Sequence, residues 1–257
     1  MKLLRYLFIF AFLFILPAGK LHAQLDVKDS VVSCGGVAFS YALQDPAADM
    51  ADRFGLSSAV GAAGWYKTKK NLLFDLRWSY IFGKDLRQGE VLDSILTSDG
   101  HLIDREGKIA DIREFERGFT LQCGIGKIFN NIHGLSPNPN CGIILSGDFG
   151  YMQHKIRIYD NGARAPQLAG DYLKGYDRLT GGFAVTGFLG YWYMSKSRYV
   201  NCFFGVEATQ AFTHSLRSWD FETMAPDTKK RNDELFGFRV GWNILIYQRS
   251  ARSYYLN

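Results

Sequence analysis

The segment 73–82 alternates between two kinds of side chain. Large apolar or aromatic residues occupy every second position from Phe74 to Phe82, and Asp75 and Arg77 lie between them. A repeat of two residues is typical of a pleated strand and not of a helix. In a soluble sheet such an apolar face would pack into a protein core. In a transmembrane barrel it faces lipid while the charges face the interior, and we interpret the segment in this second way.

The same two-faced pattern recurs along the chain and yields eight predicted strands. The connectors 68–71 and 195–198 are short, whereas most of those at the opposite ends of the strands are long. This asymmetry is typical of outer-membrane barrels, and an even strand number places both termini on the short-turn, periplasmic side. The predicted strands are 32–43, 57–67, 72–84, 115–129, 141–159, 181–194, 199–216 and 235–248, and the predicted outer loops are 44–56, 85–114, 160–180 and 217–234.

We therefore predict an all-β fold, an eight-stranded antiparallel transmembrane up-and-down β-barrel over residues 24–248. A barrel of this size is filled by its own side chains and leaves no aqueous channel. Charges in so narrow an interior should pair, because an isolated buried charge is costly. We favour a structural ion-pair plug over a proton path or gate. The predicted lumenal charges are Asp75, Arg77, Asp148, Glu207 and Arg239.

The first residues predict export. Lys2 and Arg5 precede the apolar run 7–16, and Ala23 offers a small residue at a cleavage point. The run is shorter than the roughly 20 residues that a spanning helix needs, so we expect a cleaved signal peptide over 1–23 rather than a membrane anchor. The expected location is the cell outer membrane, with residues 249–257 as a periplasmic tail.

Charge and cysteine content exclude some other classes. Removing the leader, which holds three bases and no acid, lowers the formal net charge from +5 to +2, and this gives no support for nucleic-acid binding. The four cysteines lie within predicted strands without a CxxC or Cys/His spacing. We therefore interpret them as small strand residues, although export would permit disulfides. No metal site and no cofactor is predicted.

The outer loops carry residues suited to protein contacts. Apolar spacing at 91–96 predicts a short amphipathic helix, and turn dipeptides at 99–100 and 106–107 predict a small hairpin after it. Tyrosines mixed with acids and bases at 171–178 are typical of contact surfaces. The basic run 229–231 could meet lipopolysaccharide phosphates, but we favour a solvated run. The candidate partner-contact residues are Leu92, Ile95, Gln167, Tyr172, Tyr176, Arg178, Trp219 and Phe221.

Catalytic motifs are weak, and no catalytic residue is predicted. The surviving enzyme hypothesis is a lipid-modifying hydrolase or acyltransferase, with a nucleophile and a histidine near the outer rim. His214 and Ser215 are neighbours in a strand and should point to opposite faces. Thr213 or Ser215 would therefore need His154 as the base. A porin is the least favoured alternative.

The leader, eight two-faced strands and alternating loop lengths together resemble the small outer-membrane β-barrel proteins of Bacteroidota, which include PorT-type proteins linked to type IX secretion. The loop segments 66–71, 153–158 and 174–179 look similar to family signatures. The resemblance implies a non-enzymatic accessory subunit of a secretion or outer-membrane assembly machinery. Its expected partners are outer-membrane lipid, lipopolysaccharide and other outer-membrane proteins. Such barrels often end on an aromatic residue of the last strand, whereas in this chain residues 248–257 follow Tyr247.

Overall fold

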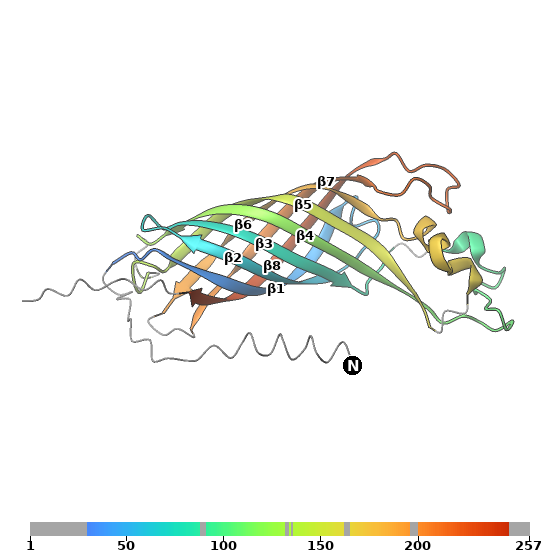
Figure 1. The fold of residues 1–257 in the computed structure, drawn as a ribbon, viewed down its shortest axis with the longest axis horizontal. Coiled ribbons are helices and arrows are strands. Elements are labelled where there is room, and N and C mark those ends of the chain that lie inside the picture. Colours follow the sequence, from blue (N-terminus) through green and yellow to red (C-terminus); the bar gives the residue numbers. More distant parts are fainter. Residues whose placement is uncertain are drawn as a thin grey trace, which may run out of the picture. The chain divides into compact units, whose positions relative to one another are not determined.

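Eight antiparallel strands close into a barrel in which each strand pairs with its neighbours in the sequence and β8 pairs with β1 (Figure 1). This is a computed structural model, and it describes residues 30–87, 91–131, 134, 136–161, 165–195 and 200–246. The predicted leader and C-terminal tail lie outside these residues. No helix among them is long and apolar enough to cross a membrane. The strands are β1 (Cys34–Ala48), β2 (Ser57–Lys67), β3 (Leu72–Gly83), β4 (Ile112–Phe129), β5 (Gly142–Asp160), β6 (Thr180–Met194), β7 (Asn201–Ser215) and β8 (Lys230–Ile246).

The alternation in the sequence becomes an inner and an outer face of the barrel. Leu76 on β3 is 55% exposed and its neighbour Arg77 is 6% exposed. Strands β5 and β7 repeat the pattern, with Phe149 and Val206 exposed beside the buried Asp148. Because successive strand residues point to opposite faces, the apolar stripe faces outward and the polar stripe fills the interior. The predicted all-β barrel of eight antiparallel strands is confirmed.

Strands β1 and β8 are longer than the sequence suggested. The predicted loop 44–56 loses residues to β1, which runs to Ala48, and the predicted loop 217–234 loses residues to β8, which begins at Lys230. The two extensions pair with each other, Pro46 lying opposite Leu235. Beyond Gln44, β1 pairs only with β8. At Pro46, β1 therefore has a partner strand on one side only, and such an edge tolerates a proline, which has no N–H to donate.

Strands β4 and β5 project beyond the rest of the barrel at the long-loop end (Figure 1). Their pairing continues to Ile112 opposite Asp160, whereas β5 pairs with β6 only as far as His154. The six residues 155–160 therefore extend about 20 Å along the strand beyond the β5–β6 pairing. The β6 side of this projection is covered by two 3-10 segments, η2 (Pro166–Leu168) and η3 (Gly170–Gly175).

The connectors differ at the two ends, as predicted. At the short-turn end β2 and β3 are joined by Thr68–Asn71, where the Asn71 backbone is left-handed with a φ of 58°. Of the turn predicted at 195–198, only Ser195 lies within the described residues. The helix predicted at 91–96 is wrong in extent, since the chain forms only a 3-10 turn, η1 (Asp93–Ile95). The small hairpin is present, with Ile103 bridged to Ile109.

Candidate functional site in the barrel interior and outer loops

A buried polar network crosses the middle of the barrel. Arg77 on β3 pairs through Nη2 with Asp148 on β5 across the interior, and the same nitrogen donates to Gln122 Oε1 at 3.1 Å. Gln122 continues the network by donating to Thr186 Oγ1 at 2.9 Å. Each buried charge or amide thus meets a polar partner, which offsets the loss of its hydration.

A second ion pair lies beside the first. Arg239 Nη1 is 3.1 Å from Glu207 Oε2, and Gln44 Nε2 donates to the other oxygen of that carboxylate at 3.0 Å. The Arg239 guanidinium also lies 4.2 Å from the centre of the Phe188 ring, a cation–π contact. The guanidinium is therefore stabilised both by charge and by a ring face.

Asp75 completes the set of predicted lumenal charges but forms no ion pair with another described residue. Its carboxylate lies near Asp148 at Gly124, where an added Cβ would stand 2.5 Å from Asp75 Oδ1 and 2.0 Å from Asp148 Oδ1. Any side chain at this position would displace the carboxylates. All five predicted charges lie in the interior, and four of them form two ion pairs.

The interior between these groups is filled. The two cavities along the middle of the described barrel hold about 20 and 40 Å³. Each has room for about one water molecule. The described residues therefore enclose no continuous aqueous channel.

The short-turn end is closed by aromatic rings and a buried lysine that the sequence reading missed. Trp65 meets Trp192 edge to face at 5.2 Å between ring centres, and Trp192 stacks on Phe203 at 5.8 Å. Lys67 is fully buried and donates through Nζ to Val32 O at 2.9 Å and to Asn140 Oδ1 at 2.8 Å. Nothing in the spacing of the sequence showed that three strands, β2, β6 and β7, bring their rings together here.

The long-loop end is closed by an apolar cluster. Met50 and Phe54 come from the β1–β2 loop and are buried against Met152, Ile156 and other interior residues. The cluster continues into the long loops, and it includes Val91, Leu92, Leu102, Ala165, Leu168 and Tyr176. The barrel and its loops thus share one hydrophobic core at this end.

The geometry of His154 and Thr213 does not make this pair a nucleophile and its base. Both bond to the same carboxylate, since His154 Nε2 lies 2.9 Å from Asp233 Oδ2 and the Thr213 hydroxyl donates to the same oxygen. A nucleophile needs the histidine as its direct base, and here the aspartate stands between them. All three side chains are buried, and the Phe54 ring packs edge-on against His154 at 5.5 Å.

Above the barrel, the candidate partner-contact residues divide into packed and exposed ones. Leu92 and Tyr176 are buried, and Arg178 forms an ion pair with Glu222. In contrast, Tyr172 is 64% exposed and Trp219 is 44% exposed. The partly buried candidates, which pack beside these residues, are Ile95, Gln167 and Phe221.

Residues 165–179 and the loop 216–229 pack against each other. The Phe221 ring lies 5.4 Å from the Tyr176 ring, and the Phe221 N–H donates to Gly175 O at 3.1 Å. A Cβ on Gly175 would stand 2.1 Å from the Phe221 ring, so this contact requires glycine. Arg217 Nε donates to Asp177 Oδ1 at 2.8 Å, and this bond raises the pKa of the Arg217 guanidinium. We call these two packed segments the loop layer.

The β1–β2 loop is bonded to the start of β8 and to β6. Asp49 accepts from the Asn232 N–H at 2.8 Å and from Lys229 Nζ at 3.0 Å, and both bonds lower the pKa of its carboxyl. Arg53 Nη1 donates to Thr180 Oγ1 at 3.0 Å. Burial lowers the pKa of the Arg53 guanidinium to about 10. These bonds hold the loop inside the rim.

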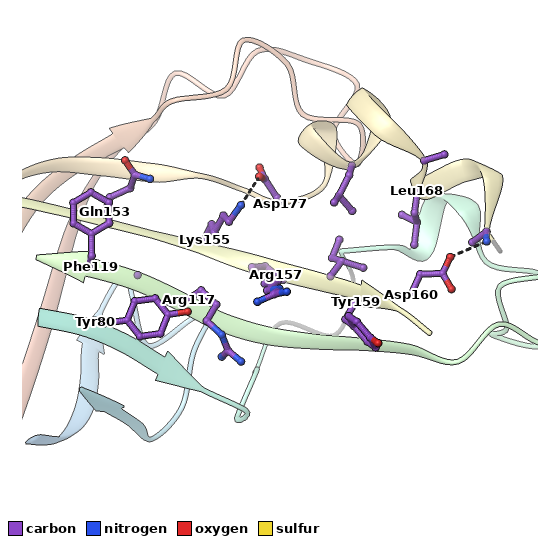
Figure 2. A pocket seen from close by; sticks show the side chains of 16 residues that line it. Tyr80, Arg117, Phe119, Gln153, Lys155, Arg157, Tyr159, Asp160, Leu168 and Asp177 are labelled. Atoms are coloured by element: carbon purple, nitrogen blue, oxygen red, sulfur yellow. Dashed lines mark hydrogen bonds and ion pairs between the residues drawn. The ribbon is translucent and has the colours of Figure 1, made fainter. Parts of the chain in front are cut away.

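A cavity of about 570 Å³ lies beside the projecting part of β5 (Figure 2). Leu168 and Leu173 of the loop layer line one side, and outward side chains of β4 and β5 line another. Figure 2 shows Lys155 bonded to Asp177, and the distance between Nζ and Oδ2 is 3.7 Å. The sequence reading did not find this cavity, because it depends on β5 outrunning its pairing with β6.

The four cysteines are free thiols. Cys34 and Cys141 are buried, Cys202 is half-buried and Cys123 is exposed on the outer face of β4. Cys141 Sγ accepts from the Met194 N–H at 3.2 Å. This agrees with their interpretation as small strand residues.

No protein-family model matches the chain, and no curated protein matches its sequence. Among solved structures, neisserial surface protein A is 9% identical with a TM-score of 0.46, covering 83% of this chain and 98% of its own. Ail of Yersinia pestis, solved with the heparin analogue sucrose octasulfate, is 9% identical with a TM-score of 0.41, covering 82% and 99%. The N-terminal β-barrel domain of Pseudomonas aeruginosa OprF is 11% identical with a TM-score of 0.36, covering 82% and 99%. At these values, none of the three transfers an activity or a ligand to this chain.

Proposed function

We propose that the chain is an integral outer-membrane β-barrel, with its short turns in the periplasm and its long loops outside the cell. The observation that carries this proposal is the ring of exposed apolar side chains around a polar interior. Monomeric soluble proteins rarely expose apolar patches of more than a few hundred Å². The exposed set includes Phe39, Leu76, Trp78, Leu121, Leu145, Phe149, Leu189, Val206, Phe238 and Trp242.

The height of this ring fits a bilayer. On β5 the outward apolar side chains run from Ile143 to Tyr151. Eight residue steps span about 27 Å along the strand, or roughly 20 Å across the membrane at the usual tilt. An apolar band of about 25 Å is typical of outer-membrane barrels. The ring is therefore close to the height that lipid would cover.

We further propose that the loop layer binds a protein partner and that the chain serves as a non-enzymatic accessory of a secretion or outer-membrane assembly machinery. Its resemblance to PorT-type proteins suggests type IX secretion. Tyr172 and Trp219 are exposed on loops whose other residues are packed together. Exposed aromatic residues on a preorganised surface are typical of binding hot spots. The filled interior gives no support for a porin, and the buried His154 gives none for a lipid-modifying enzyme.

Affinity purification of the tagged chain from native membranes in mild detergent tests this proposal. We expect larger outer-membrane proteins to co-purify, and we expect the double variant Y172A/W219A to recover much less of them. A matched control is S94A/T223A, which alters two exposed polar residues of the outer loops. A wild-type chain recovered alone, or equal recovery with Y172A/W219A, would contradict the partner role.

A further inference from the structure

Three basic side chains form a cluster on the outer surface of β4 and β5. Arg117 lies directly opposite Lys155 across the two strands, and Arg157 lies opposite Phe115, two residues before Arg117. All three line the cavity beside β5 (Figure 2). We call Arg117, Lys155 and Arg157 the basic cluster.

The basic cluster shares its cavity with two carboxylates, Asp160 and Asp177, and each of these already accepts a hydrogen bond from outside the cluster. Arg117 bonds to the carbonyl oxygens of Gly83 and Glu116, and Arg157 forms no described ion pair. Only Lys155 meets an acid, Asp177 at 3.7 Å, and Arg217 already binds that carboxylate. Like charges directly opposite on paired strands are destabilising, so an anion bound between them would relieve their repulsion.

Two basic residues near the start of β8, Lys229 and Arg231, differ from the basic cluster because each has an acidic partner. Lys229 Nζ is 3.0 Å from Asp49, and Arg231 Nη2 is 2.6 Å from Asp227. Both bases therefore have a counter-charge within the protein, and Arg231 is buried where a solvated run was expected. Lys229 and Arg231 each have an acid of their own, which Arg117 and Arg157 lack among the described residues.

The basic cluster lies at the height of lipid headgroups. Phe119 and Tyr151 belong to the apolar ring, and Arg117 follows Phe119 by two residues toward the outside. Two residues rise about 7 Å along a strand, or about 5 Å across the membrane. The headgroup layer occupies roughly 5–8 Å on each side of the hydrocarbon. Cations at this level meet headgroup phosphates.

We propose that the basic cluster binds the phosphates of an outer-leaflet glycolipid of the lipid A type, with its phosphosugar in the cavity beside β5. This inference rests on the proposed outer-membrane location and adds a lipid site to it. Arg117 and Arg157 supply guanidinium donors suited to bidentate phosphate contacts. Leu168 and Leu173 add an apolar wall to the same cavity.

Native mass spectrometry of the detergent-solubilised chain tests the site, using bisphosphorylated lipid A as the probe. The variant R117Q/K155Q/R157Q should bind this lipid at least about tenfold more weakly. The control K108Q/K174Q/K229Q removes three exposed lysines that have acidic partners, so it changes the net charge equally. We expect the control to bind like the wild type. A difference in gel mobility between heated and unheated samples verifies that each variant is folded.

Four outcomes would overturn the inference. One is equal binding by the cluster variant, and another is an equal loss in the control, which would indicate net charge alone. The third is unchanged binding of fully dephosphorylated lipid. The fourth is displacement of lipid A by millimolar inorganic phosphate, which would indicate a site for free phosphate and not for a glycolipid. A chain that proved soluble without detergent would instead overturn the proposed function itself, so the two failures are distinguishable.

Discussion

Arg77 and Asp148 show what a buried charge requires in this protein. They come from strands β3 and β5, which are not neighbours, and they meet above Gly124 of the strand between them. Breaking a buried pair costs more than replacing it, because the remaining charge keeps its desolvation penalty. The pair therefore constrains the wall of the barrel from within.

We predict that R77M lowers the free energy of unfolding by about 3 kcal/mol, because Asp148 would stay buried without its cation. Urea unfolding of the chain in detergent micelles measures this. The double variant R77M/D148N should recover most of the loss, because the amide carries no charge. Equal stability of R77M and the wild type would show that the pair does not hold the barrel together.

Sequence alone predicted the face of each lumenal residue but not its partner. The period of two placed Asp75, Arg77 and Asp148 inside, since parity along a strand is a local property. The pairing across the interior depends on the stagger of eight strands around the ring, which no single segment encodes. The same limit hid the contact between Trp65 and Trp192, whose strands are far apart in the sequence.

At the scale of elements, the strand centres were predictable and the outer ends were not. Residues such as Asp45, Pro46 and Glu234 are rare in strands, so the pattern appeared to stop before the pairing of β1 with β8 did. The apolar spacing at 91–96 reflects packing into the shared core at the loop end and not a helix. Tertiary contacts decide the structure in both places.

Carboxylates hold the β1–β2 loop to the segment before β8, and this predicts a pH response. Bonds from Asn232 and Lys229 lower the pKa of Asp49. Burial raises the pKa of Asp227, but the hydrogen bond and charge of Arg231, the Lys229 N–H and the charge of Arg53 together lower it below its usual value. The stabilisation is complete above the unfolded pKa of about 3.9 and is lost as the pH falls through the folded values. We therefore expect these contacts to loosen only below about pH 4.

The fluorescence of Trp219, obtained as the difference between the wild type and W219F, follows this transition because Trp219 lies on the adjoining loop. The variant D49N should show part of the change already at neutral pH. A signal that stayed flat through acidification, with the barrel still folded, would show that these carboxylates do not hold the loop.

As a whole molecule, the barrel has a polar interior and an apolar outer surface, the reverse of a soluble protein. In the middle of the ring the ion pairs Arg77–Asp148 and Arg239–Glu207 face inward, and aromatic and aliphatic side chains face outward. Closure of the sheet leaves no edge along the ring, so backbone groups there are paired strand to strand. The loop layer and the basic cluster are placed by this arrangement, because both extend from strands that the ring holds in register.

The accessibility of nitroxide labels along β7 to oxygen and to a nickel chelate tests whether lipid covers the ring of outward apolar side chains. Labels are placed singly at 203–208 in a cysteine-free chain reconstituted into vesicles. If lipid covers the ring, positions 204 and 206 are reached by oxygen and not by the polar chelate, while 205 and 207 are shielded from both. High chelate accessibility at 204 and 206 would show that water, and not lipid, covers the apolar ring.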